Sequence, residues 1–426
     1  MTETFMPYKV SARECLRKTF IDKLSRKLFF ALMKDFKIGK LILIEKNQQY
    51  PFGQSSKGVS LEATIHVHHP RFYTSIVFGG SLGSAEAYIA GLWSTSHLTH
   101  VIRLVILNRQ LMEKMDKGWS WICNPVHKWY HYFRRNTLTG SKENIVAHYD
   151  LGNDFYRLFL DETLTYSCGI FEHENSTLED ASTSKYDRIC RKLQLHPGDH
   201  VMEIGGGWGG FSIYAAKNYG CHVTTTTISD EQYALAEKRI AASGLSHRIQ
   251  LLRRDYRRLV GKFDKLVSIE MVEAVGHQYL DTFFHICSRL LKANGIMLLQ
   301  AITIIDQVFD AHKRSVDFIK RYIFPGSCIP SIHAMMRSIA RETDLKLFHL
   351  EDITPHYVRT LVEWRKRFFD HMDDVRNMGF SNAFIRMWEY YFSYCEAGFA
   401  ERYIGDVQML LTKPMCKREP FLPPLP

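Results

Sequence analysis

The pattern of hydrophobic and polar positions changes near residue 143. Beyond that point, short apolar runs of strand length alternate with amphipathic runs of helix length. Such alternation predicts a doubly wound, mostly parallel sheet with helices on both faces and a ligand site at the carboxyl ends of its strands. We expect strands at residues 200–204, 221–228, 249–252, 263–269, 295–304 and 406–411, helices at 230–243 and 279–291, and an aromatic helical run at 358–399.

The N-terminal part has a mixed pattern without this alternation. Strands are expected at residues 40–45 and 60–66, and helices at 71–78, 84–92 and 98–117. A polar stretch that contains glycine then has the composition of a linker. The sequence therefore predicts a smaller α+β domain that engages lipid at residues 1–135, a linker at 136–142 and a catalytic domain at 143–426.

Two N-terminal segments combine apolar and basic side chains. Residues 13–40 form a basic amphipathic pattern, with apolar side chains at fourfold spacing at Leu16, Phe20, Leu24, Leu28, Leu32 and Phe36. Residues 118–135 mix Trp and Tyr with Lys and Arg. The first segment is interpreted either as a helix on the domain core or as one lying on anionic lipid. The second suits a bilayer interface or an aromatic seam between domains.

Composition narrows the class of protein. A chain of 426 residues with 46% hydrophobic residues can bury a large core, and its net charge of +10 suggests a polyanionic partner such as nucleic acid or an anionic membrane. Nine cysteines without a CxxC pair indicate a reducing compartment and argue against zinc, and we expect no metal. No apolar run has transmembrane length. We expect a cytoplasmic protein associated peripherally with the inner face of the membrane.

The stretch MEIGGGWGGF, residues 202–211, is a glycine loop between an expected strand and an expected helix. Such a corner fits an adenosyl cofactor. The spacing of Gly205, Gly207 and Gly210 also suits a dinucleotide, with Asp230 as a ribose acid. However, Glu203 begins the acid-x-Gly-x-Gly pattern of S-adenosylmethionine methyltransferases, and the next strand ends in threonines rather than an acid. The loop favours a methyltransferase over a dehydrogenase and leaves both open.

Polar residues follow several of the expected strands. Asp255 could accept a hydrogen bond from the adenine amino group, or could cap the following turn. Thr227 and Gln232 lie where the second strand meets its helix, although Gln232 could instead complete a capping box. Glu270 and Glu273 follow the fourth strand, close to where a sulfonium would lie, and we expect one of them to be structural.

From His66 to its end, the chain resembles the cyclopropane-fatty-acyl-phospholipid synthases. The matching stretches, besides the glycine loop, are GSLGSAEAY (80–88), HYDLGND (148–154), TYSC (165–168), TISDEQ (227–232) and YIFPG (322–326). Their order and spacing are far more specific than a glycine loop. The resemblance implies a Rossmann-like class I methyltransferase domain, an S-adenosylmethionine cofactor and a homodimer.

The resemblance also implies residue roles. S-adenosylmethionine would be contacted by Tyr166, Ser167, Gly205, Gly207, Thr227 and Gln232. A bicarbonate ion would be held by Cys168, Glu273, Ile302 and Tyr357, with Tyr149 lining the same pocket. Cys395 matches a cysteine of the family's active site, and we interpret it as a pocket wall or a buried core thiol.

Three positions depart from the commoner family pattern. Gln300 and Ala274 each replace a histidine, and Gly206 replaces a cysteine of the glycine loop. The glutamine occurs in a plant-like branch of the family. An amide at Gln300 can donate a hydrogen bond to bicarbonate, but it cannot titrate near neutral pH.

We therefore predict a synthase that adds a methylene bridge across the cis double bond of unsaturated phospholipid acyl chains. Attack by the alkene generates carbocation character, which aromatic faces can stabilise, and a base must then remove a proton. Bicarbonate is the predicted base. A methyl- or methylene-branched product is the alternative outcome of the same chemistry. A silent lipid-binding protein and a nucleic-acid methyltransferase are the other classes considered, and no nucleic-acid partner is expected.

Overall fold

A computed structural model describes residues 12–54, 60–110 and 151–421, with side chains from residue 20 onward. The chain forms two compact units. One comprises Met1–Val126 together with Ser381–Ser393, and the other comprises His127–Phe380 with Tyr394–Pro426. The predicted linker at residues 136–142 and the segment 118–135 lie outside the described residues. Within the described part of the chain, no helix is both long and apolar enough to cross a membrane.

The first unit contains a four-stranded sheet in the order β2-β1-β3-β4. Its described elements are α1 (Ala12–Met33), β1 (Lys40–Glu45), β2 (Gln48–Phe52), β3 (Glu62–Val67), α2 (Arg71–Ile89), β4 (Trp93–Ser94) and α3 (Leu98–Leu107). β1 pairs antiparallel with β2 and parallel with β3. The expected α+β pattern of this unit is confirmed, and β2 is an element that the hydrophobic pattern did not predict.

Two differences between the expected and the observed helices have local causes. The helices predicted on either side of Gly79-Gly80 merge into α2, but the backbone breaks at Gly80, with φ 57° and ψ −138°. The helix predicted at residues 98–117 is interrupted at Asn108. The Asn108 side chain accepts from the backbone N–H groups of Lys37 and Ile38 and donates to the carbonyls of Ile38 and Leu104. An asparagine that bonds neighbouring backbone in this way competes with the helix ladder.

A short C-terminal segment belongs to the first unit, which the sequence did not indicate. Arg386 donates to the carbonyls of Tyr88 and Trp93 at 2.6 and 2.8 Å, and its guanidinium lies 4.0 Å from the centroid of the Tyr88 ring. The Tyr88 hydroxyl donates to Glu389 at 2.7 Å. These contacts attach the first part of α16 (Asn382–Ala400) to α2.

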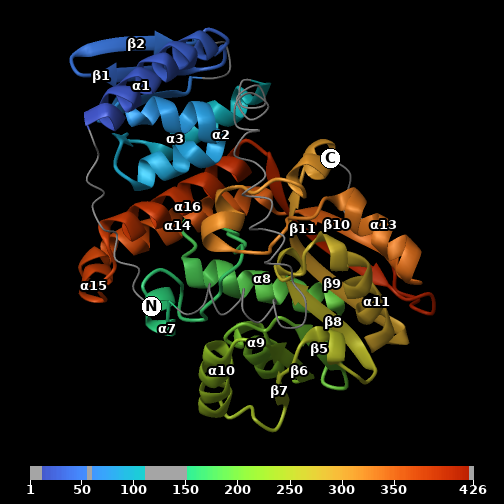
Figure 1. The fold of residues 1–426 in the computed structure, drawn as a ribbon. Helices are drawn as coiled ribbons and strands as arrows, with labels where there is room; N and C mark the ends of the chain where they lie inside the picture. The colour runs from blue at the N-terminus through green and yellow to red at the C-terminus, as the bar shows by residue number, and fades with distance from the viewer. Residues whose placement is uncertain (1–11, 55–59, 111–150, 422–426) are drawn as a thin grey trace. The chain divides into compact units, whose positions relative to one another are not determined.

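The second unit is built on a seven-stranded sheet in the order β10-β11-β9-β8-β5-β6-β7 (Figure 1). The strands are β5 (His200–Ile204), β6 (His222–Thr227), β7 (Ile249–Arg253), β8 (Phe263–Ile269), β9 (Leu291–Ile304), β10 (Lys346–Asp352) and β11 (Ile404–Thr412). β5 to β9 are parallel, and β11 runs antiparallel to both β9 and β10. The predicted doubly wound, mostly parallel sheet is confirmed.

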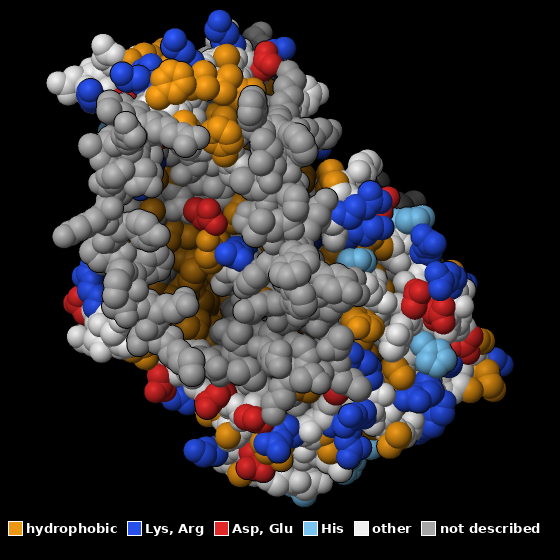
Figure 2. Space-filling view, viewed as in Figure 1, with side chains coloured by type: hydrophobic (Ala, Val, Ile, Leu, Met, Phe, Trp, Pro, Cys, Tyr) orange, Lys and Arg blue, Asp and Glu red, His pale blue; other side chains and the backbone are white. Residues whose placement is uncertain are grey.

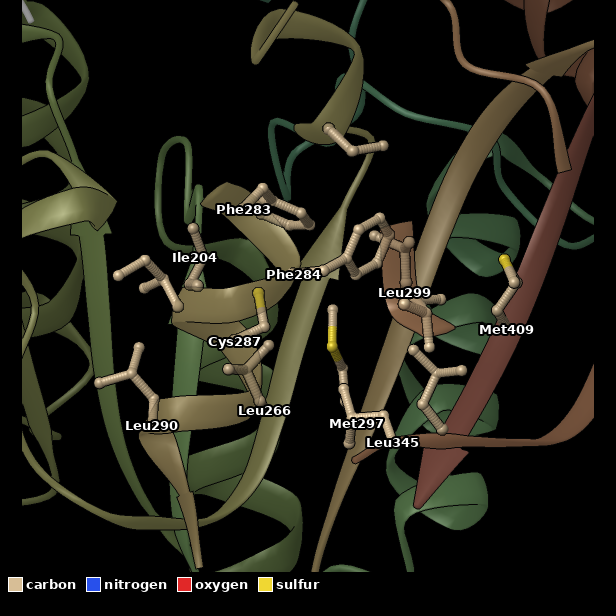
Figure 3. Close-up of a cluster of buried hydrophobic side chains, with 14 of the residues drawn as sticks. Ile204, Leu266, Phe283, Phe284, Cys287, Leu290, Met297, Leu299, Leu345 and Met409 are labelled. Atoms are coloured by element: carbon tan, nitrogen blue, oxygen red, sulfur yellow. The ribbon is translucent and has the colours of Figure 1, made fainter. Parts of the chain in front are cut away.

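Helices cover both faces of this sheet, because successive residues of each strand alternate between two apolar cores. Met297 and Leu299 of β9 face the core beneath α11 (Leu280–Leu290) and α13 (Ile332–Glu342), which Figure 3 shows. Leu298, between them, faces the core beneath α8 (Leu178–Leu193), α9 (Gly210–Tyr219) and α10 (Asp230–Ala242). Burial on both faces explains why these strands are continuous apolar runs.

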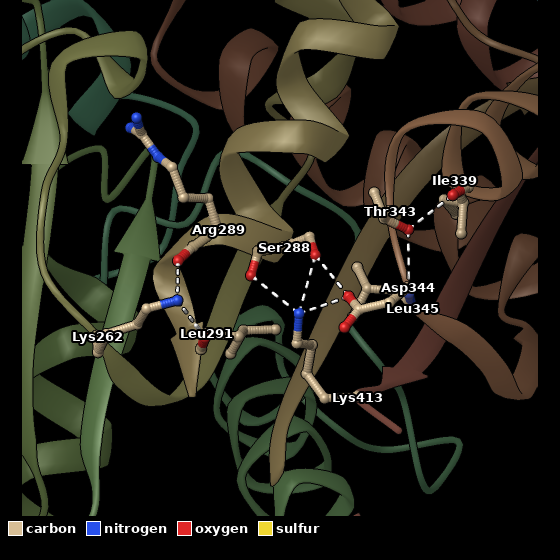
Figure 4. Close-up of polar contacts among 9 residues, drawn as sticks. All are labelled: Lys262, Ser288, Arg289, Leu291, Ile339, Thr343, Asp344, Leu345 and Lys413. Carbon is tan, nitrogen blue, oxygen red and sulfur yellow. Dashed lines mark hydrogen bonds and ion pairs between the residues drawn. The ribbon is translucent and has the colours of Figure 1, made fainter. Parts of the chain in front are cut away.

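Two lysines form hydrogen bonds at the edge of the sheet where the parallel strands begin (Figure 4). Lys413, just after β11, donates to the side chains of Asp344 at 2.5 Å and Ser288 at 3.1 Å. Lys262 donates to the carbonyls of Arg289 and Leu291. The remaining helical elements of this unit are α7 (Asn153–Arg157), α12 (Asp306–His312), a π-helix at Ile319–Ile323, α14 (Thr354–Asp370), α15 (Met372–Asn377) and short 3₁₀ turns, including Tyr256–Arg258 and Val272–Ala274.

Candidate active site

The glycine loop follows β5 and is fixed on one side only. The backbone N–H groups of Gly205 and Gly206 donate to the carbonyl of Thr226 at 3.2 and 3.0 Å. Gly205 has φ 87°, and a Cβ there would lie 2.6 Å from Cγ of Met271. Gly207 has φ 54°, and a Cβ there would meet no atom within 4 Å. The loop therefore packs against the chain after β8 and has open space above Gly207, as a ligand-binding loop requires.

The side chain of Glu203 links the elements on either side of this loop by hydrogen bonds. Its side chain is buried, and Oε2 accepts hydrogen bonds from Thr225 at 2.6 Å and from Ser212. Burial raises the pKa of Glu203. A Cβ on Gly206 would lie 2.0 Å from Oγ1 of Thr225 and 2.9 Å from Oε2 of Glu203. The cysteine that the family commonly has in this loop therefore does not fit beside Thr225.

Thr227 and Gln232 contact each other where β6 meets α10. The Thr227 hydroxyl donates to Oε1 of Gln232 at 2.9 Å. The backbone N–H of Gln232 donates to Oγ of Ser229, the N-cap of α10, at 3.2 Å. The Gln232 backbone thus caps the helix, while its side chain lies against the expected cofactor-binding threonine.

Asp255 has the capping role that the sequence left as its alternative. It accepts from the backbone N–H of Arg257 at 2.9 Å, at the start of the 3₁₀ turn Tyr256–Arg258. Both of its carboxylate oxygens also receive the Arg257 guanidinium, at 2.8 and 2.6 Å. Contact between Asp255 and adenine stays a prediction.

Tyr166 and Ser167 lie between an aromatic cluster and a buried cation. The ring centroid of Tyr166 is 5.2 to 6.3 Å from those of Trp364, Tyr156, Phe159 and Phe324. The Ser167 hydroxyl accepts from Nζ of Lys185 at 2.7 Å. Lys185 comes from α8 and is fully buried, and burial lowers its pKa. Sequence reasoning did not single out this lysine.

Glu270 is the centre of the polar cluster. Its Oε1 accepts from the backbone N–H of Cys168 and from Nε2 of Gln300, both at 2.8 Å. Its Oε2 accepts from the Tyr357 hydroxyl at 2.6 Å. Glu270 has φ 46°, which is uncommon for a residue with a Cβ and is found at functional sites where neighbouring groups hold it. Three residues assigned to the ion pocket from the sequence therefore meet at a carboxylate of the chain itself.

Glu273 lies one turn further along. Its Oε1 accepts from the backbone N–H of Ile302, whereas its Oε2 is out of contact with solvent and has no hydrogen-bond partner among the described residues. Burial and the negative charge of Glu270 raise the pKa of Glu273 to about 8. Glu273 is therefore mostly protonated at neutral pH and can donate a hydrogen bond rather than accept a proton.

A further buried acid, Asp406 of β11, lies beside Gln300. Nε2 of Gln300 donates to Oδ2 of Asp406 at 3.2 Å, and Oδ1 of Asp406 has no partner among the described residues. Burial, and then the charge of Glu270, raise the pKa of Asp406 well above its usual range. A signal existed in the sequence, because Asp406 and Gln408 alternate with apolar residues in a run of strand type, and buried polar groups require partners.

The thiols of Cys168 and Cys395 are not activated as nucleophiles. Cys168 is completely buried, and burial raises the pKa of its thiol well above the ordinary value. Cys395, on the second part of α16, also has its pKa raised by burial. A raised pKa disfavours the thiolate, and whether Cys395 is a pocket wall or a core thiol stays a prediction. Tyr149 lies outside the described residues, and no cluster of metal-ligating side chains occurs among the residues that the structure describes.

Comparison with known proteins decides the family. The model of the mycolic acid cyclopropane synthetase family matches residues 136–409. The chain belongs to this family. It is 34% identical over 358 residues to cyclopropane-fatty-acyl-phospholipid synthase of Escherichia coli, across 82% of this chain and 87% of that one. It is 36% identical over 341 residues to the tuberculostearic acid methyltransferase UfaA1 of Mycobacterium tuberculosis, across 78% and 79% of the two chains.

Solved structures of the family agree with the fold. The cyclopropane synthase MmaA2 from M. tuberculosis has a TM-score of 0.60 and 32% identity, over 64% of this chain and 98% of that one. The mycolic acid cyclopropane synthase CmaA1, solved with S-adenosylhomocysteine (SAH) and CTAB, has a TM-score of 0.59 and 31% identity, over the same shares of the two chains. The chain described here is therefore an S-adenosylmethionine-dependent methyltransferase, as its sequence predicted.

The bicarbonate that the family resemblance implies does not fit the described cluster. The N–H of Cys168, the amide of Gln300 and the hydroxyl of Tyr357 already donate to Glu270. An added anion would lose these donors and would lie against a carboxylate, which repels it. We therefore derive no step through bicarbonate.

Proposed function

We propose that this enzyme transfers a methylene unit from S-adenosylmethionine across the cis double bond of unsaturated phospholipid acyl chains and forms a cyclopropane ring. The observation that carries the proposal is the junction between the glycine loop and the carboxylate cluster. Met271, which packs on Gly205, directly follows Glu270. Groups suited to bind the cofactor and groups suited to move a proton therefore meet at the carboxyl edge of one sheet.

The open side of the glycine loop would hold the cofactor, with contacts from Tyr166, Ser167, Thr227 and Gln232. A relative with 31% identity was solved with SAH, the product of methyl transfer, which supports this assignment. When bound, S-adenosylmethionine supplies an electrophilic methyl group on a sulfonium. The ammonium of Lys185 would repel a sulfonium of the same charge. Its hydrogen bond to Ser167 keeps it in place within the cluster.

The aromatic cluster around Tyr166 would serve the alkene. An alkene is a poor nucleophile, so it must be held close to the methyl and in line with the breaking bond. Attack leaves positive charge on carbon, which the faces of Tyr166 and Trp364 can stabilise by cation–π attraction. Tyr357 extends the same cluster, since its ring stacks on Phe399 with centroids 4.2 Å apart and lies 6.1 Å from Trp364.

Helix α1 would bring the enzyme to its lipid substrate. Its buried side packs on α2 through Phe29, leaving Phe20 and Leu24 exposed by 69% and 48%. Exposed lysines, Lys23 and Lys27, lie between and beside them. Figure 2 shows exposed hydrophobic side chains bordered by basic ones over this part of the chain. An apolar row flanked by lysines suits the surface of an anionic bilayer.

Incubation with S-adenosylmethionine labelled on its methyl group tests the proposal. The purified protein is offered vesicles of unsaturated phospholipid, vesicles of saturated phospholipid, and RNA. We expect label in the unsaturated lipid only, with a mass increase of one CH₂ and cyclopropane proton resonances in the extracted fatty acids. Resonances of a methylene or methyl branch in place of cyclopropane protons would show that the enzyme branches the chain without closing a ring. Label in RNA would overturn the lipid assignment.

A further inference from the structure

The carboxylate of Glu270 accepts hydrogen bonds from residues that the family resemblance assigns to the bicarbonate pocket. It gathers one backbone N–H, one amide N–H and one hydroxyl, at 2.6 to 2.8 Å. These donors match an oxyanion with two oxygens. The Glu270 backbone has φ 46°, a conformation that glycine adopts more readily, and its N–H donates to the carbonyl of Gln300 at 2.8 Å. A residue with this uncommon backbone conformation and three hydrogen bonds to its side chain is a functional candidate.

The position of Glu270 relative to the cofactor segments is equally specific. On one side, it bonds the N–H of Cys168, the residue after Ser167. On the other side it precedes Met271, whose Cγ would lie 2.6 Å from a Cβ on Gly205. Glu270 is therefore held between the two segments that are assigned to the cofactor.

Neighbouring acids are less suited to accept a proton. The pKa of Glu273 is raised to about 8, and the pKa of Asp406 is raised well above its usual range, both because of burial and the charge of Glu270. A carboxyl that keeps its proton cannot accept another one, so Glu273 and Asp406 are excluded as the base. Lys185 lies close enough to this cluster for Glu270 to oppose the lowering of the Lys185 pKa by burial.

We propose that Glu270 is the base of this enzyme and replaces bicarbonate within the chain. The inference rests on the proposed cyclopropane synthesis. The alkene's π pair forms a C–C bond to the sulfonium methyl while the C–S bond breaks and leaves its electron pair on sulfur. Glu270 then takes a proton from that methyl, and the C–H electron pair closes the ring onto the cationic carbon. Positive sulfonium and negative carboxylate become neutral thioether and neutral carboxylic acid, so atoms and charge balance.

Two substitutions of one residue test the proposal. Glu270→Gln keeps the shape and removes the base, so the rate should fall roughly 10²- to 10⁴-fold with unchanged S-adenosylmethionine affinity. Glu270→Gly suits φ 46° and opens space for an ion. It should still melt cooperatively, turn over slowly without bicarbonate and recover when bicarbonate is added. The wild type should run at full rate in bicarbonate-free buffer.

Binding of ¹³C-labelled bicarbonate, followed by NMR, separates this inference from the proposed function. The wild type should show no saturable site, whereas Glu270→Gly should show one, whatever lipid is methylated. Saturable binding to the wild type, a wild-type rate that falls when bicarbonate is withdrawn, or full activity of Glu270→Gln would each overturn the assignment of Glu270. A wild type that labels no lipid but excludes bicarbonate would refute the lipid substrate and still support the occupied pocket.

Discussion

The side-chain amides of Gln408 and Gln300 bond directly across β11 and β9, with Nε2 of Gln408 donating to Oε1 of Gln300 at 3.0 Å. The orientation of both amides is fixed by Lys192, whose Nζ donates to Oε1 of Gln408 at 2.7 Å. An ammonium has only donors, so each amide must turn its oxygen toward the lysine side. The NH₂ group of Gln300 is thereby directed at Glu270.

Replacing Gln408 should disturb this orientation without touching the cofactor. In Gln408→Glu, the new carboxylate has no donor for Gln300, so the Gln300 amide should turn and present its oxygen to Glu270. We expect kcat to fall about tenfold, equivalent to about 1.4 kcal/mol, with unchanged S-adenosylmethionine affinity. Gln250→Glu, on the exposed side of β7, is the matched control and should leave kcat unaltered. Equal kcat in both variants would remove Gln408 from the orienting role.

The open side of the glycine loop can be tested with paired glycines. Gly207 and Gly244 both have positive φ, at 54° and 71°, and neither would bring a Cβ within 4 Å of another atom. Alanine at either position should therefore cost a similar amount of stability, about 1 kcal/mol. Only Gly207→Ala, or the larger Gly207→Val, should weaken S-adenosylmethionine binding in calorimetry. Similar affinity in the Gly207 and Gly244 variants would mean that the cofactor does not approach this face of the loop.

Membrane docking through α1 predicts separate apolar and electrostatic contributions. Phe20→Ser with Leu24→Ser should reduce vesicle binding at every salt concentration. Lys23→Gln with Lys27→Gln should remove about 1 kcal/mol per lysine on anionic vesicles only, and should flatten the salt dependence. Val260→Ser and Lys238→Gln are exposed controls in the second unit. Arg26 should be left intact, because it pairs with Glu45 at 2.7 Å. Sedimentation that is the same for all variants would rule out α1 as the lipid contact.

The raised pKa of Glu273 predicts a pH-dependent stability. Between its ordinary pKa and about 8, the unfolded chain loses this proton while the folded protein keeps it. The folded state therefore loses stability as pH rises through this window, by at most about 1.4 kcal/mol per pH unit from this group. Glu273→Gln cannot titrate at this position. The unfolding free energy of this variant, relative to that of the wild type, should therefore increase from pH 5 to pH 8. A constant difference across that range would show that Glu273 is ionised in the folded protein.

The sequence alone determined the catalytic fold, because burial on both faces of a parallel sheet leaves apolar runs that can be read along the chain. The predicted strand at residues 263–269 matches β8, and the predicted helix at 230–243 ends one residue beyond α10. The glycine loop and the polar residues after each strand could also be located, since the carboxyl ends of parallel strands share one edge.

Only the tertiary structure decided which polar residues act together. The expected apolar stripe of α1 includes Phe20 and Leu24, but the helix packs through Phe29 and Met33, because a helix buries the face that its neighbours complement. Likewise, Glu270 and Glu273 have the same chemistry and nearly the same position in sequence. Glu270 receives hydrogen bonds from three segments that are distant in sequence, whereas Glu273 is left with an unpaired oxygen among the described residues and keeps its proton. Burial and long-range partners, which no local pattern contains, assign the two roles.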